Sequence, residues 1–170
     1  GEYVFAQRKQ QGLASREILR ELLPQLIAAL SFPRTMRWGT GDFRFPRPIR
    51  WLAALFNDEV IPFTIAGIES GNVSWGHRFH GSGPVPITAS TYLDDLRRSH
   101  VIVDGGERRQ SIIRQVEEAA KACGGQVLWD EGLLDEVTNL VEYPIAVWGE
   151  FESDMLEMPR EVLITPMKEH

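Results

Sequence analysis

Arginine and aromatic side chains alternate through residues 36–51, and glycine and proline separate them. Guanidinium groups grip phosphate with paired donors, aromatic rings stack on unpaired bases, and glycine lets a backbone approach closely. A second stretch, Gly76 to His80, repeats this chemistry. The two stretches predict RNA-contacting side chains, and the candidates are Arg37, Arg44, Arg47, Arg50, Trp51, His77, Arg78 and His80.

An alternative interpretation of the first stretch is structural. Its aromatic residues would then belong to the core, and its arginines would pair with acids from the second half of the chain. The net charge is −6, yet residues 1–80 hold ten Lys or Arg and seven Asp or Glu, whereas residues 81–170 hold eight and seventeen. Because salt limits the reach of distant charges to about 8–10 Å, an acidic chain can still bind phosphate through a local basic face. Composition leaves both interpretations open.

Other kinds of site have weaker support in the sequence. The lone Cys123 lies on the apolar face of a predicted helix, at the end where the helix dipole disfavours a thiolate, so we expect a core thiol. His77 and His80 supply two possible metal ligands, whereas a zinc site needs three or four. No glycine-rich phosphate-binding motif is present. We therefore expect no catalytic, metal-binding or cofactor-binding residue here.

Hydrophobic spacing predicts the elements that position these side chains. Residues 13–30 predict a helix that Pro24 kinks or divides, and residues 34–48 predict an irregular loop. Residues 49–56 and 60–65 predict a hairpin whose second strand, with Pro62, lies at an edge. Beyond the hairpin we expect helices over 91–100 and 159–164, two helices capped by Asp104 and Asp130, and short strands over 101–103 and 145–148.

The two capped helices each show one apolar face. Asp104 with Glu107 has the form of a capping box, and Asp130 can cap the next helix. The expected inward residues are Ile112, Ile113, Val116, Ala119, Ala120 and Cys123 on the first helix, and Leu133, Leu134, Val137, Leu140 and Val141 on the second. Helices and short strands mix without βαβ alternation, so the predicted class is α+β, a mixed sheet flanked by helices. We expect an N-terminal helical arm over 1–33 and an α+β domain over 34–170.

The sequence also indicates the cellular compartment of the protein. A single cysteine excludes an internal disulfide and favours a reducing environment, which indicates the cytoplasm. No apolar run approaches the length of about 18 residues that a membrane span needs. The chain lacks an initiator Met and stops abruptly at Met167–His170, so we expect a fragment of a longer protein.

Five blocks of sequence carry a family resemblance. They are Met36–Gly39, Phe45–Leu52, Gly76–His80, Leu133–Thr138 with Val141–Pro144, and Thr165–His170. In these blocks the chain resembles the β subunit of the bacterial heterotetrameric glycyl-tRNA synthetase. Each block alone is weak, but all five occur in family order and span almost the whole chain.

The resemblance implies a fold, partners and cofactors. This segment would be an α+β module, truncated at its C-terminal end, like the B3/B4 domain of the phenylalanyl-tRNA synthetase β chain. The α subunit would hold the class II site for ATP, Mg²⁺ and glycine, and the β subunit would bind glycine tRNA, with HD-type and anticodon-binding domains beyond this segment. No family catalytic residue maps onto these positions, so the isolated fragment is expected to be inactive although the whole enzyme is a ligase.

Three roles for the segment follow. It could be a non-catalytic part of the ligase that supports tRNA binding and assembly, or a purely structural packing domain between β-subunit modules or against the α subunit. A third role is editing of mischarged tRNA, but glycine is the smallest amino acid and a tight site excludes larger ones. Exposed arginines would favour the first role over the second, and a pocket ringed by His77 and His80 would favour editing.

Overall fold

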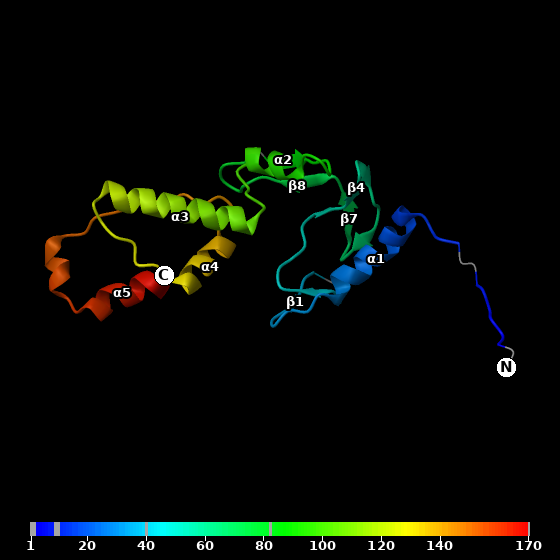
Figure 1. The fold of residues 1–170 in the computed structure, drawn as a ribbon, viewed down its shortest axis with the longest axis horizontal. Coiled ribbons are helices and arrows are strands. Elements are labelled where there is room, and N and C mark those ends of the chain that lie inside the picture. The colour runs from blue at the N-terminus through cyan, green and yellow to red at the C-terminus, as the bar shows by residue number, and fades with distance from the viewer. Residues whose placement is uncertain (1–2, 9–10, 40, 82, 170) are drawn as a thin grey trace. The chain divides into compact units, whose positions relative to one another are not determined.

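The computed structural model describes residues 3–8, 11–39, 41–81 and 83–169 of the chain (Figure 1). The chain divides into two compact units. One comprises Gly1–Ser74 with Pro84–Tyr92, and the other comprises Trp75–Gly83 with Leu93–His170. Five α-helices and nine short strands among the described residues confirm the predicted α+β class. The expected boundary between an arm over 1–33 and a domain over 34–170 stays a prediction.

The first unit begins with helix α1 (Ser15–Ala29), which confirms the helix predicted over 13–30. Pro24 lies inside α1 and does not divide it. No residue of α1, all of which the structure describes, is buried. An ion pair between Arg16 and Glu59 joins this helix to the strands that follow.

Most of the strands belong to the first unit, and all of them are short. They are β1 (Met36–Arg37), β2 (Arg44–Phe45), β3 (Leu52–Ala53), β4 (Leu55–Phe56), β5 (Glu59–Val60), β6 (Thr64–Ile65), β7 (Ile68–Gly71), β8 (Val73–Trp75) and β9 (Pro84–Pro86). Strand β3 runs parallel to β7, and β6 runs antiparallel to it, so the three form a small mixed sheet. Strand β6 lies at the edge of this sheet. Pro62 precedes β6 and lies outside its ladder, as expected for a residue that cannot donate to one.

The hairpin predicted over 49–65 is present but shorter than expected. Strands β4 and β5 pair around Asn57, whose φ of 56° lies in the left-handed region. The preceding β3 instead pairs with β7. The hydroxyl of Ser70 on β7 accepts from the N–H of Phe63 at 2.9 Å and donates to the carbonyl of Ile61 at 2.7 Å. The core of this unit lies around these strands and consists of Ile61, Ile65, Val85 and Ile87.

The second unit is mostly helical. Its helices are α2 (Tyr92–Arg98), α3 (Gly105–Ala122), α4 (Glu131–Leu140) and α5 (Arg160–Glu169), with a 3₁₀ turn over Ser153–Glu157. Both predicted caps are confirmed: Asp104 Oδ1 accepts from the N–H of Glu107 at 2.8 Å, and Asp130 Oδ1 accepts from that of Leu133 at 3.2 Å. Helix α3 packs against α4, and the buried residues are Leu96, Ile112, Leu134, Thr138 and Pro144.

Three predicted local conformations are wrong. The expected irregular loop over 34–48 contains the β1–β2 hairpin. The expected strand over 101–103 is irregular, because the carbonyls of Ile102 and Val103 both accept from the guanidinium of Arg108. The expected strand over 145–148 is also irregular, and Val147 is 87% exposed.

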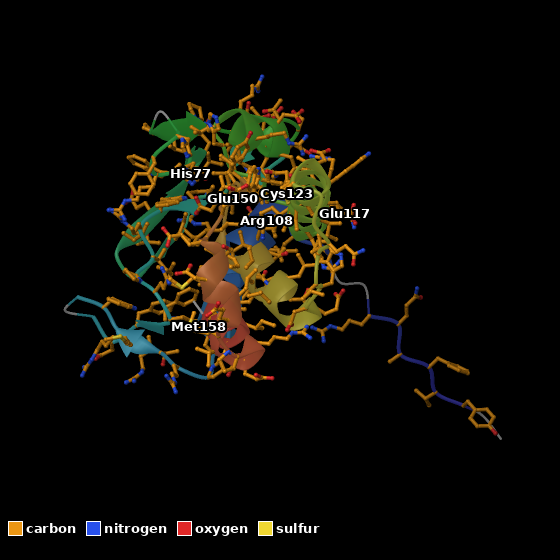
Figure 2. All side chains as sticks on the ribbon, turned by 90° about the vertical axis from the view of Figure 1, so that its left-hand side faces the viewer. His77, Arg108, Glu117, Cys123, Glu150 and Met158 are labelled. Atoms are coloured by element: carbon orange, nitrogen blue, oxygen red, sulfur yellow. The ribbon has the colours of Figure 1, made fainter. Side chains whose placement is uncertain are left out.

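Two residues expected in the core are exposed. Leu140 is 70% exposed, since the buried face of α4 is centred on Leu134 and Thr138, and Leu140 points away from it. Cys123 lies at the C-cap of α3 (Figure 2), past the end of the buried stripe, and is exposed. The expectation of a core thiol is therefore wrong.

Candidate nucleic-acid interface

The β1–β2 hairpin presents two arginines side by side. Arg37 lies directly opposite Arg44 in the antiparallel register, so both side chains leave the same face. Like charges at directly opposed positions destabilise a strand pair. The polar contacts of the pair are slight: Arg37 Nη1 lies 3.0 Å from Oδ1 of Asp42, which is 98% exposed, and Arg44 Nε lies 3.4 Å from Thr35 Oγ1. Both guanidinium groups remain available to an anion.

Phenylalanines hold this hairpin in place, next to the end of α1 (Figure 1). The rings of Phe43 and Phe45 stack with centroids 5.9 Å apart, and Phe32 meets Phe45 edge-on at 4.9 Å. All three are half buried. Trp38 Nε1 donates to the carbonyl of Phe45 at 2.9 Å, while 38% of the residue stays exposed. The phenylalanines therefore take the structural role that the sequence left open, and Trp38 keeps an accessible surface.

Arg47, Arg50 and Trp51 follow β2 directly along the chain. Both arginines are exposed, and neither has an ion pair or hydrogen bond with any residue in the described part of the chain. Trp51 is 42% exposed. These side chains extend the cationic and aromatic character of the hairpin into the next segment.

The second candidate group belongs to one tight turn of the second unit. His77 Nδ1 accepts the N–H groups of Phe79 and His80, both at 3.2 Å, so a neutral His77 carries its proton on Nε2. The N–H of Gly81 donates to the carbonyl of His77 at 2.7 Å. A Cβ on Gly81 would lie only 2.6 Å from the nitrogen of His77, so this turn requires glycine.

Rings stack outward from this turn. His77 stacks on His80 with centroids 4.8 Å apart, His80 lies 5.7 Å from His100, and His100 meets Tyr143 edge-on at 5.0 Å. His100 Nδ1 is buried and has no hydrogen-bond partner among the described residues. This row of four rings gives the turn a rigid aromatic support.

Arg78 projects from the same turn. Its guanidinium carbon lies 5.6 Å from the ring centroid of Phe79, which is 81% exposed. This cation–π pair is a surface feature and contributes little stability in water. It presents one cation and one aromatic face together.

The predicted residues thus fall into two groups. Arg37, Arg44, Arg47, Arg50 and Trp51 belong to the hairpin of the first unit and the segment after it, and His77, Arg78 and His80 share one turn of the second. The sequence missed His100 and Tyr143, because nothing in their local spacing signals that they stack on the turn. Neither described cavity is lined by His77 or His80.

The described residues also bear on metal binding and on membrane spanning. No group of three or more His, Cys, Asp or Glu among them is placed to hold a metal ion. None of the helices in the described part of the chain is long and apolar enough to cross a membrane.

Comparison with known proteins identifies the family. A family model for the glycyl-tRNA synthetase beta subunit matches residues 1–170. The chain is 51% identical over 172 residues to the glycine–tRNA ligase beta subunit of Geobacter metallireducens, covering 100% of this chain and 25% of that protein. It is 45% identical to the corresponding subunits of Nitratidesulfovibrio vulgaris, over 172 residues (100% and 24%), and Clostridioides difficile, over 170 residues (99% and 25%).

The chain belongs to the glycyl-tRNA synthetase beta subunit family, as the five sequence blocks indicated. It spans about a quarter of the length of the curated relatives that it matches.

Proposed function

We propose that this chain is a non-catalytic segment of a glycine–tRNA ligase β subunit that supports tRNA binding and assembly of the enzyme. The observation that carries the proposal is the exposure of Arg37, Arg44, Arg47, Arg50 and Arg78. Buried arginines paired with acids would have favoured a purely structural role. Here the only carboxylate partner of these five, among the described residues, is the highly exposed Asp42.

The proposal assigns the ATP-dependent activation of glycine, with Mg²⁺, to the α subunit, and assigns no cofactor to this segment. Its partners are the α subunit, glycine tRNA and the remainder of the β subunit, in the cytoplasm. The proposed fold is of the B3/B4 kind found in the phenylalanyl-tRNA synthetase β chain. Phosphate contacts from arginines position a nucleic acid without reading its sequence, so this segment contributes affinity and leaves tRNA identity to other parts of the enzyme.

The test is a tRNA titration of the assembled enzyme at several salt concentrations. Replacing Arg44, Arg47 and Arg50 together with alanine removes three exposed guanidinium groups. Each phosphate contact releases condensed counterions, so the slope of log affinity against log salt should shrink by about 0.7–0.9 per arginine. The preference for glycine tRNA over other tRNAs should not change.

A matched control removes three exposed cations elsewhere, with Arg20, Lys121 and Arg160 replaced by alanine. This variant should keep the wild-type salt slope. The packing-domain role predicts the opposite pattern for the hairpin variant: an unchanged slope and a melting temperature well below wild type. That result would overturn the proposal.

A further inference from the structure

An open cavity of about 480 Å³ lies on the second unit, outside the two groups of candidate residues. One face of α3 forms its floor, with Gln110, Ser111 and Arg114 among the lining residues. Arg97 of α2 lines one side, and the segment from Tyr143 to Ile145 lines another. A volume of this size is within the range of about 300–1,000 Å³ found for small-molecule sites.

The cavity is preformed, because one side chain ties its wall to its floor. Gln115 Nε2 donates to Ser111 Oγ and to the carbonyl of Pro144, each at 3.0 Å. Gln115 Oε1 accepts from the N–H of Ala146, also at 3.0 Å. Both N–H groups and the oxygen of the Gln115 amide therefore take part in hydrogen bonds to the floor and the wall. These bonds leave the wall little freedom to collapse into the cavity.

The charges of the lining favour an anion. Arg97 pairs with Glu107, so the one carboxylate of the lining is already neutralised. Arg114 is exposed, and its guanidinium group has no ion pair or hydrogen bond with any residue that the structure describes. Ser111 Oγ accepts from Gln115, so its own O–H is left to donate. An uncompensated guanidinium and a hydroxyl donor thus line the same cavity.

The wall from Tyr143 to Ile145 carries one aromatic ring and two apolar side chains. Tyr143 is held edge-on against His100, and Pro144 and Ile145 continue the wall. A phosphate ion alone would leave this wall and most of the volume unused. A ligand that carries both a phosphate and a planar ring would use the guanidinium and the wall together.

We infer that this cavity binds a nucleotide, with its phosphate at Arg114 and its base against the wall of Tyr143. The nucleotide has two possible sources, an unpaired nucleotide of an RNA strand or a free mononucleotide. The inference extends the proposed function, because it gives the second unit a separate contact with one unpaired nucleotide. It rests on the proposed function only where that nucleotide belongs to tRNA.

The experiment uses photo-crosslinking of the full-length subunit that contains these residues. One probe is 8-azido-AMP, and the other is an RNA trinucleotide ending in 8-azidoadenosine. Trypsin cleaves after Lys121 and Arg160 with no Lys or Arg between them, so a single peptide, 122–160, carries the cavity wall. The crosslinked fraction of this peptide at increasing probe concentration gives the affinity of this cavity alone, whatever else in the subunit binds nucleotides.

Arg114→Gln should weaken labelling of peptide 122–160 about tenfold, as expected for the loss of one charge-assisted contact, and Arg114→Glu should weaken it further. Neither change should lower the melting temperature, since Arg114 is exposed. Arg20→Gln and Arg20→Glu are the matched controls, because Arg20 is an exposed helical arginine outside the cavity, and they should label as wild type does. Labelling by both probes indicates a site for free nucleotides, and labelling by the trinucleotide alone indicates an RNA strand.

Absence of label from peptide 122–160, or equal labelling of the Arg114 and Arg20 variants, would overturn the inference. The variant lacking Arg44, Arg47 and Arg50 separates it from the proposed function. That variant should label peptide 122–160 normally while its salt slope for tRNA falls. A normal salt slope with Arg114-dependent labelling would refute the hairpin's role and leave the nucleotide site standing.

Discussion

Replacing Arg108 with methionine should destabilise the second unit more than replacing its neighbour Arg109, although only Arg109 has carboxylate partners. Arg108 lies on α3 (Figure 2) and is half buried. Its Nη1 donates to the carbonyls of Ile102 and Val103, at 2.6 and 2.8 Å, and its Nε donates to that of Thr138 at 3.0 Å. One guanidinium thus joins the segment before α3 to the last turn of α4.

The magnitude follows from the number of acceptors and their burial. A hydrogen bond from a charged donor contributes about 1.5–3 kcal/mol, and a buried carbonyl left unpaired costs about 1–3 kcal/mol. Because the environment of Arg108 is only partly buried, water can reach some of the freed carbonyls, and we expect a net loss of about 2–4 kcal/mol. Arg109 pairs with Glu131 and Asp135, which are 76% and 69% exposed, so Arg109→Met should cost at most about 1 kcal/mol.

Urea unfolding of the chain, followed by far-ultraviolet circular dichroism, measures both effects. With a slope of about 2 kcal/mol per molar urea, Arg108→Met should lower the midpoint by about 1–2 M, and Arg109→Met by no more than about 0.5 M. Arg108→Lys should fall between them, since an ammonium group lacks the planar fork that reaches three carbonyls. Equal midpoints for the two methionine variants would refute the reasoning.

Three further predictions concern other parts of the chain. Cys123→Ala should change the free energy of unfolding by less than about 0.5 kcal/mol and leave aminoacylation by the assembled enzyme intact, because the thiol is exposed; lost activity with folding preserved would contradict this. Gly81→Ala should open the turn at His77 and speed hydrogen exchange there, whereas Gly149→Ala should not, since nothing lies within 4 Å of its added Cβ. The isolated chain should show no glycine-dependent pyrophosphate exchange; measurable exchange would reveal an active site that the sequence and the structure did not indicate.

Local signals explain the parts of the fold that the sequence predicts correctly. Asp104 and Asp130 each cap a helix through an N–H only three residues away, so the cap can be recognised without tertiary information. Apolar residues recur at helical spacing along α1 and along α3. Both helices can therefore also be recognised without tertiary information. Helices built on such short-range patterns are the most predictable elements of the chain.

Distant side chains decide the parts that sequence patterns miss. The apolar run at 101–103 has the composition of a strand, yet the carbonyls of Ile102 and Val103 accept from the side chain of Arg108, and the N–H of Ile102 donates to the backbone carbonyl of Glu142. The run at 145–148 also has the composition of a strand, yet Gln115 Oε1 on α3 accepts the N–H of Ala146. Periodicity cannot assign these four apolar residues, because the hydrogen bond at Ala146 comes from a side chain some thirty positions away.

The candidate interface also has features that the sequence predicts and features that depend on distant contacts. Residue type alone marks the arginines and aromatics, but it cannot separate Phe43 and Phe45, which pack together, from Trp38, which keeps part of its surface exposed. The nucleotide cavity could have been suspected from the polar spacing of Gln110 and Arg114 on α3. The wall of this cavity consists of residues 143–145, which follow α4, so the spacing along α3 does not predict it.

The register of the hairpin adds an argument that composition cannot supply. A single-residue shift would place Arg37 and Arg44 on opposite faces, because side chains alternate along a strand. The observed register instead sets the two cations directly opposite each other, and Asp42, almost fully exposed, offsets little of their repulsion. An anion bound between the two guanidinium groups would offset what remains of this repulsion. A hairpin that binds such a ligand would therefore gain stability from it, and phosphate groups of an RNA backbone are anions of the required kind.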